Sequence, residues 1–135
     1  RTHTKDGSCF YLIPQFQDKS TGKYIIDFRV SFIDYIINTD LQYKFSEKAL
    51  MQIKEPKLGV ELDSHQWHER TKEQAQRDKE RERLLIANEW KLLRFTGREV
   101  YRNPEKCLDE LESVAINMAY DWYKKLEQSQ ENKGK

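Results

Sequence analysis

The sequence predicts an α/β domain in which a mixed β-sheet is flanked by helices, with elements in the order β-β-β-α-β-α. Two segments rich in aromatic and β-branched residues, 9–17 and 23–33, are separated by turn residues and predict a β-hairpin. Residues 69–88 are almost all helix formers with no Gly or Pro, which predicts a long helix.

Composition indicates one globular protein. The chain has 135 residues, of which 37% are hydrophobic, and its 24 Lys and Arg nearly balance its 23 Asp and Glu. Net charge therefore gives no indication of nucleic-acid binding by itself. No apolar run approaches the roughly 18 residues of a membrane span, and no signal-peptide pattern opens the chain. We expect a soluble, cytoplasmic protein with one domain over residues 1–126 and a disordered tail over 127–135.

The predicted hairpin carries a carboxylate in an apolar strand. Pro14 in the first strand indicates an edge position or a bulge, and residues 18–22 form the turn. Asp27 stands in the middle of the run KYIIDFRVSFI. Burying an unpaired carboxylate costs several kcal/mol, so Asp27 must be paired or must bind a ligand. An ion pair with a neighbour such as Arg29 is the structural alternative, and we favour the functional one.

Residues 34–57 show weak periodicity of either kind and are interpreted as an insertion between two strands. The insertion would be a flap over the site or a partner contact. A short helix is expected from Ser46 to about Ile53, with Ser46 as its N-cap and Pro56 after its end.

A third strand begins with Leu58-Gly59-Val60 and places Glu61 and Asp63 one residue apart. Alternate residues of a strand leave the same face, so these two carboxylates repel each other. A divalent cation between them would turn that repulsion into binding. The pair therefore predicts half of a metal site.

The long helix has a polar stripe. Alternating steps of three and four residues give Thr71, Gln74, Asp78, Arg81 and Leu85, where a packed helix normally carries apolar residues. Either the helix is solvated and laced with opposite charges, or its polar face is turned toward a site. In the second case Gln74 and Arg81 would approach the carboxylates, while Lys79 and Glu80 would face water.

The end of the chain predicts a strand and a helix. Residues 90–95, WKLLRF, form the fourth strand, and Thr96-Gly97 turns the chain. Asn103 as N-cap and Pro104 at the first helical position start the last helix. Its apolar face, typical of core packing, runs to about residue 126 and consists of Leu108, Leu111, Ala115, Met118, Ala119 and Trp122. Cys9 and Cys107 are expected to be reduced thiols without a role.

Taken in order, these residues resemble the PD-(D/E)XK nuclease superfamily, whose signature is an Asp followed at variable distance by Glu-x-Lys. They resemble more closely the small endonuclease-like domains related to very-short-patch repair endonucleases. Those domains carry Glu-x-Asp-Gly, a nearby His, a helix with Gln, Asp and Arg, and a strand ending Leu-Arg-Phe. The matching segments are ELDSHQWH at 61–68, the helix from Gln74 to Arg81, and LRFTGREV at 93–100. The resemblance covers roughly residues 12–111 apart from the insertion and implies a restriction-endonuclease-like fold.

Two positions depart from the family pattern. Asp63 stands where the superfamily has its Lys, so another cation must stabilise the phosphate, and the candidates are Arg81, Lys91 and Arg94. Ser64 replaces the Gly that usually follows the Asp, which affects the backbone turn but not the carboxylates. The family's helix before the first strand has no counterpart, and the first residue is Arg rather than Met, so we expect a fragment of a longer chain.

The resemblance implies a DNA endonuclease whose catalytic residues are Asp27, Glu61, Asp63, His68, Gln74 and Arg81. The three carboxylates would bind Mg²⁺ or Mn²⁺, which takes oxygen ligands, polarises a phosphate and lowers the pKa of an attacking water. His68 would act as a base or orient that water, unless it caps the helix or packs beside Trp67. Zinc is not expected at His65 and His68, because a second pair of N or S ligands is lacking at suitable spacing.

Other functions are compatible with the same residues. A nuclease fold could bind DNA without cleaving it or serve as a scaffold, although the intact carboxylates and His68 argue against this. A hydrolase of small phosphate esters is disfavoured because no Gly-rich phosphate loop is present. The expected partner is DNA and not a membrane, with the chain as a homodimer or part of a larger polypeptide.

Overall fold

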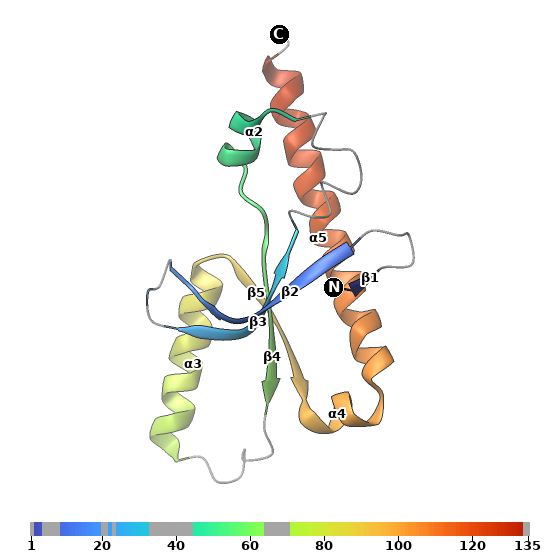
Figure 1. Ribbon diagram of the computed structural model, residues 1–135. Helices are drawn as coiled ribbons and strands as arrows, with labels where there is room; N and C mark the ends of the chain where they lie inside the picture. Colours follow the sequence, from blue (N-terminus) through green and yellow to red (C-terminus); the bar gives the residue numbers. More distant parts are fainter. Residues whose placement is uncertain are drawn as a thin grey trace. The chain divides into compact units, whose positions relative to one another are not determined.

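A computed structural model of the chain describes residues 2–3, 9–19, 22, 24–32, 45–63 and 71–133. Its elements, labelled in Figure 1, are β1 (Thr2–His3), β2 (Cys9–Gln17), β3 (Ile25–Ser31), α2 (Glu47–Gln52), β4 (Lys57–Asp63), α3 (Lys72–Ala87), β5 (Trp90–Thr96), α4 (Gly97–Arg102) and α5 (Pro104–Lys133). The strands form a sheet in the order β1-β2-β3-β4-β5. The sheet is mixed, because β1 is antiparallel to β2 and β4 is parallel to β5. The predicted α/β fold with a mixed sheet and flanking helices is confirmed.

The described residues group into two compact units, each built from separate segments. The first unit draws on Arg1–Leu12, Val30–Pro56 and Glu112–Lys135, and the second on Ile13–Arg29 and Lys57–Leu111. The expectation of one domain over residues 1–126 stays a prediction. None of the described helices is long and apolar enough to cross a membrane.

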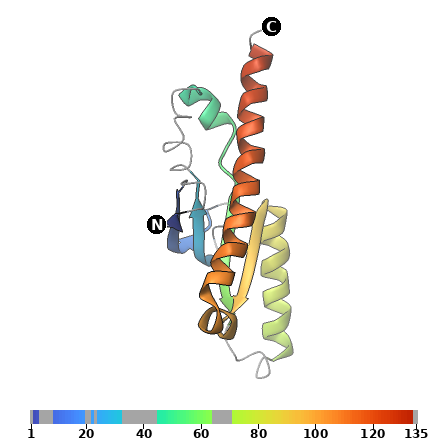
Figure 2. The same ribbon diagram turned by 90° about the vertical axis from the view of Figure 1, so that its right-hand side faces the viewer.

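The second unit contains the strand–helix–strand segment β4-α3-β5. Lys57 pairs with Trp90 and Asp63 with Thr96 in the parallel ladder, so both strands end side by side. Helix α3 is in contact with β5, and Figure 2 shows the two elements side by side. Leu85 of α3 is fully buried and packs in one cluster with Ile26 and Trp90. This cluster anchors the end of α3 on the strands that carry the predicted site.

Gly59 allows close packing across β4. A Cβ atom at Gly59 would lie only 2.9 Å from Ile26 Cγ2 and 2.9 Å from Leu92 Cδ2. Real Cβ atoms do not approach other atoms so closely, so these two side chains occupy the space that any other residue would fill.

The described residues of the predicted hairpin turn make backbone hydrogen bonds. The Asp18 amide donates to the Tyr24 carbonyl at 3.0 Å, and the Gly22 amide donates to the Asp18 carbonyl at 2.9 Å. Gly22 has a φ of 65°, a left-handed conformation that glycine adopts without strain. Next to Pro14, Gln15 has a φ of 50°, an irregularity of the kind that Pro14 suggests in this strand.

The first unit has an aromatic core around α2 and α5. The rings of Phe32 and Trp122 pack edge to face with centroids 6.5 Å apart, and those of Phe45 and Tyr123 with centroids 5.5 Å apart. Trp122 Nε1 also donates to the Ile53 carbonyl at 3.0 Å, at the end of α2. This hydrogen bond satisfies a buried indole N–H and ties the two helices together.

The described part of the insertion matches the sequence prediction. Helix α2 begins after Ser46, whose side chain accepts a hydrogen bond from the Ala49 amide at 3.2 Å, and Ile53 ends it. Residues 33–44 lie outside the described residues.

The end of the chain contains a helix that the sequence did not predict, and its tail differs from the prediction. Thr96-Gly97 is not a simple turn, because the Thr96 side chain accepts from the Glu99 amide at 3.1 Å and the Glu99 carboxylate accepts from the Thr96 amide at 2.8 Å. This reciprocal capping box starts α4. The disordered tail expected from Glu127 is helical through Lys133, since Leu126 is buried and the following residues are mostly helix formers.

Helix α5 otherwise starts as predicted, because Asn103 Oδ1 accepts from the Lys106 amide at 3.1 Å and Pro104 occupies the first position. Of its predicted apolar face, Leu111, Ala115, Ala119 and Trp122 are buried, whereas Leu108 is 43% exposed. Leu108 was therefore wrongly assigned to the core.

Candidate active site

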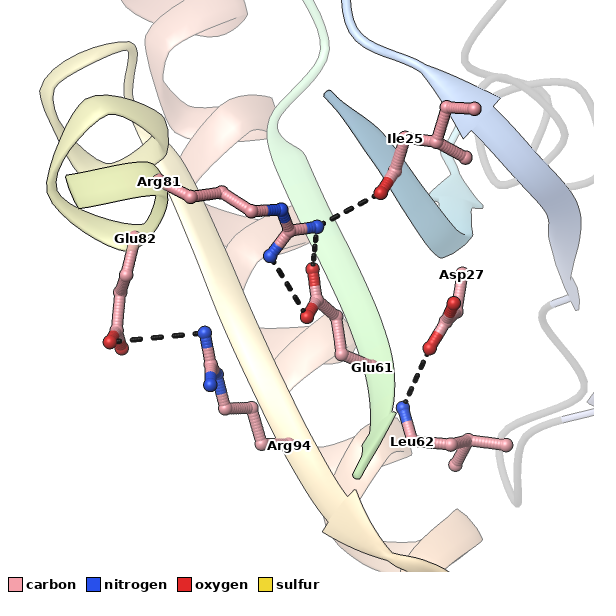
Figure 3. Close-up of polar contacts among 7 residues, drawn as sticks. All are labelled: Ile25, Asp27, Glu61, Leu62, Arg81, Glu82 and Arg94. Atoms are coloured by element: carbon pink, nitrogen blue, oxygen red, sulfur yellow. Dashed lines mark hydrogen bonds and ion pairs between the residues drawn. The ribbon is translucent and has the colours of Figure 1, made fainter. Parts of the chain in front are cut away.

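Glu61 and Arg81 form a bidentate ion pair. Arg81 Nη1 donates to Glu61 Oε2 at 3.1 Å, and Nη2 donates to Glu61 Oε1 at 2.5 Å (Figure 3). The side chains are only 18% exposed for Arg81 and 10% for Glu61. Arg81 Nη2 also donates to the Ile25 carbonyl at 2.9 Å. One guanidinium from α3 thus holds a carboxylate of β4 and the backbone of β3.

The surroundings of Arg81 keep it charged. Burial alone would lower the pKa of Arg81, but the hydrogen bond and charge of Glu61 and the charges of Asp78 and Asp27 raise this pKa above its usual value. Arg81 is therefore a cation beside the Glu61 carboxylate.

Asp27 approaches β4 at the residue next to Glu61. Its Oδ2 accepts a hydrogen bond from the Leu62 amide at 2.9 Å. In Figure 3 the Asp27 carboxylate points to this amide, whereas the Glu61 carboxylate points to Arg81. The two predicted ligands thus come from the adjacent strands β3 and β4, and Asp27 contacts β4 at the residue that follows Glu61.

A backbone hydrogen bond also explains how Asp27 is accommodated in an apolar strand, a possibility that the sequence analysis did not consider. The Arg29 guanidinium, named as an alternative partner, lies over aromatic rings. Its Cζ is 4.7 Å from the centroid of Phe16 and 5.3 Å from that of Trp90.

The register of β4 and β5 sets which side chains share a face. Glu61 is paired with Arg94, and Asp63 with Thr96. Paired residues of a ladder leave the same face and alternate residues repeat it, so Glu61, Asp63 and Arg94 lie on one face. Lys91 is paired with Leu58 and belongs to the opposite face.

The polar stripe of α3 changes character along the helix. Gln74 is exposed, Arg81 is partly buried and Leu85 is fully buried. Lys79 and Glu80 are exposed, as expected. The solvated-helix alternative therefore describes the first turns, and the site-facing alternative describes the turn at Arg81.

Gln74 has a different role from the one expected. Its Oε1 accepts from the Thr71 amide at 3.1 Å, while the Thr71 side chain accepts from the Gln74 amide at 3.1 Å. The expectation that Gln74 approaches the carboxylates is thus replaced by a capping box at the start of α3. The same end of the helix borders a surface pocket of about 420 Å³ lined by Tyr24, Gln74, Arg77, Asp78, Glu80 and Arg81.

Sequence reasoning missed two groups that hold Arg81. One is the Ile25 carbonyl, and the other is Tyr24, whose ring centroid lies 5.7 Å from Arg81 Cζ. Neither has a local sequence signal, because both contacts depend on where α3 crosses the hairpin strand. His68, His65 and Ser64 lie outside the described residues, so the assignment of His68 as base stays a prediction.

The acidic residues suit a hard cation but do not form a preassembled cage. Among the described residues, no three His, Cys, Asp or Glu side chains are grouped so that they could hold a metal. Mg²⁺, however, is usually bound through one or two carboxylates and keeps several waters. Asp27 and Glu61 on adjacent strands fit this mode, with Asp63 on the face of Glu61.

Acidic residues on the adjacent strands β3 and β4 of a mixed sheet, with Glu61 held by Arg81 of the following helix, fit a restriction-endonuclease-like fold. The family model REase_MTES_1575 matches residues 17–114, from the end of β2 into α5, and the chain belongs to this restriction-endonuclease-like family. Neither the curated proteins nor the solved structures gave a significant match. The matched range includes all of the predicted site residues.

Proposed function

We propose that the protein is a metal-dependent endonuclease that hydrolyses phosphodiester bonds in DNA. The observation that carries the proposal is the position of Asp27 and Glu61 at neighbouring points of adjacent strands in a chain of a restriction-endonuclease-like family. Among the described residues, Asp27 and Glu61 offer carboxylate oxygens there, which favours Mg²⁺ or Mn²⁺ over a soft metal.

Asp27 and Glu61 would hold the cation, with Asp63 as a further ligand. When bound, such an ion polarises the scissile phosphate and lowers the pKa of an attacking water. The protein's own part is positioning. Arg81 fixes the Glu61 carboxylate through two hydrogen bonds, and the Leu62 amide fixes that of Asp27. His68 would take the proton of the water or orient it.

A second candidate, a nuclease fold that binds DNA without cleaving it, is favoured by one observation. Both carboxylate oxygens of Glu61 accept hydrogen bonds from Arg81, so Glu61 already has a cationic partner. In an active nuclease the cation must share Glu61 with Arg81 or displace it.

Incubation with supercoiled plasmid separates the two functions. We expect the wild-type protein to nick or linearise plasmid with Mg²⁺ or Mn²⁺ and not in the presence of a chelator. Glu61→Gln keeps the shape of the side chain but loses its charge, and should lower the cleavage rate by about 100-fold or more. Glu80→Gln, on the exposed side of α3, is the matched control and should cleave normally.

Binding of DNA without cleavage under either metal would favour the non-catalytic module. Cleavage by Glu61→Gln at the wild-type rate would instead show that the active site lies elsewhere.

A further inference from the structure

A DNA phosphate would bring further negative charge to a site that already contains three carboxylates. Glu61 and Asp63 share one face of β4, and Asp27 lies beside Leu62. A DNA phosphate is itself anionic, and phosphodiester hydrolysis adds negative charge in the transition state. A side-chain cation on the same face would offset this repulsion, and the structure allows the candidates to be compared.

Arg81 already binds protein groups through its guanidinium. Its two terminal nitrogens make three hydrogen bonds, two to the Glu61 carboxylate and one to the Ile25 carbonyl. Lys91 is excluded as the cation of this face by the register of the strands. It pairs with Leu58, and its side chain projects from the face of β5 opposite to that of Arg94.

Unlike Lys91, Arg94 lies on the Glu61 face, and unlike Arg81 it has a long ion pair. It pairs with Glu61 in the parallel ladder and therefore projects from the face that carries Glu61 and Asp63. Its ion pair is loose, with Nη2 3.8 Å from Oε2 of Glu82 on α3 (Figure 3). Its buried Nε has no hydrogen-bond partner among the described residues, although the side chain is still 24% exposed.

A guanidinium offers five N–H donors in a planar fork that matches the oxygens of a phosphate. Nε of Arg94 is covered by the protein, so the terminal nitrogens are the donors left for an anionic ligand. Glu82 holds one of them, Nη2, only at 3.8 Å.

We propose that Arg94 binds a DNA phosphate at the Glu61 face. Its positive charge would offset the repulsion between this phosphate and the carboxylates, because the position of Asp63 provides no cation. The inference rests on the proposed nuclease function for its effect on rate, but not for its effect on DNA binding. Arg94 contacts the substrate directly and is in this sense a catalytic residue.

The test uses Arg94→Gln, which removes the charge but keeps a polar side chain, and Arg94→Lys, which restores the charge without the fork. Lys91→Gln is the matched control, since Lys91 is an exposed cation of the same strand on the opposite face. Binding to a fluorescent DNA duplex is measured by anisotropy over a range of salt concentrations, with Ca²⁺ in place of Mg²⁺ to prevent cleavage. Each measurement is made below the melting midpoint of the variant.

We expect the slope of log Kd against log salt to fall by about one unit for Arg94→Gln, because one phosphate contact is lost. Arg94→Lys should keep the slope, and Lys91→Gln should leave it unchanged. With Mg²⁺, the single-turnover cleavage rate should fall roughly 10²- to 10³-fold for Arg94→Gln and be partly restored in Arg94→Lys.

The two proposals fail in different ways. A wild-type salt slope for Arg94→Gln would overturn the phosphate contact, whether or not the protein cleaves DNA. Absence of cleavage by the wild-type protein, with the slope reduced in Arg94→Gln, would overturn the nuclease proposal and leave Arg94 as a DNA-binding residue.

Discussion

The ion pair between Glu61 and Arg81 makes a specific prediction about stability. Replacing Arg81 with Leu leaves the Glu61 carboxylate, 10% exposed, without the guanidinium that donates to both of its oxygens. Breaking a buried pair by removing one partner costs about 3–5 kcal/mol, because the remaining charge stays buried. Since both side chains keep some exposure, we expect the free energy of unfolding to fall by about 3 kcal/mol.

A double variant isolates the charge effect from packing. In Arg81→Leu combined with Glu61→Leu no uncompensated charge is left, and a well-packed apolar pair is often as stable as the ion pair it replaces. The double variant should therefore be more stable than either single variant, although it would lack the Glu61 carboxylate that the proposed activity needs.

Urea unfolding followed by tryptophan fluorescence measures these differences. Arg83→Leu, at an exposed position of the same helix, is the control and should change the free energy of unfolding by no more than about 0.5 kcal/mol. The raised pKa of Arg81 means that its contribution is fully present below its ordinary pKa and lost only as pH rises through the raised value. The difference between wild type and Arg81→Leu should thus be constant from roughly pH 7 to pH 9. An Arg81→Leu variant as stable as wild type would refute the buried pair.

Three further substitutions, the first with a control, test other parts of the protein. Gly59→Ala forces a Cβ against Ile26 and should lower the free energy of unfolding by about 1–3 kcal/mol. The control Gly97→Ala should be nearly neutral, because no atom lies within contact distance of a Cβ at Gly97. Equal thermal midpoints for the two variants would contradict the close packing at Gly59. Thr71→Ala removes the capping box of α3 and should cost about 1 kcal/mol in chemical unfolding; no loss would mean that the cap is not formed in solution. His68→Ala should lower DNA cleavage roughly 10²- to 10⁴-fold at an unchanged melting midpoint, and a lowered midpoint with an unchanged rate would make His68 structural.

Local signals in the sequence predicted local structure well. Ser46 and Asn103 were identified as caps because a cap depends on residues within one turn. The same kind of signal was present and overlooked at Thr71 and Thr96, each followed three residues later by Gln or Glu. Recognising the first of these would have assigned Gln74 to the helix start rather than to the active site.

The rest of the site depends on strand register and helix docking, which sequence periodicity does not specify. Alternation places Lys91 and Arg94 on opposite faces, but only the pairing of Glu61 with Arg94 shows which face is acidic. The hydrogen bond from the Leu62 amide to Asp27 likewise needs the position of β3 against β4. The stripe of α3 predicted that Arg81 is turned toward the carboxylates, but not that it is paired with Glu61.

Calorimetric titration with Mn²⁺ tests most directly whether Asp27 and Glu61 form a cation site. Asp27→Asn is the variant of choice, because its side-chain oxygen can still accept from the Leu62 amide and so preserve the local structure. We expect wild type to bind Mn²⁺ and Asp27→Asn to bind it about 10-fold or more weakly at an unchanged melting midpoint. Equal Mn²⁺ affinity of the two proteins would contradict a cation site that includes Asp27.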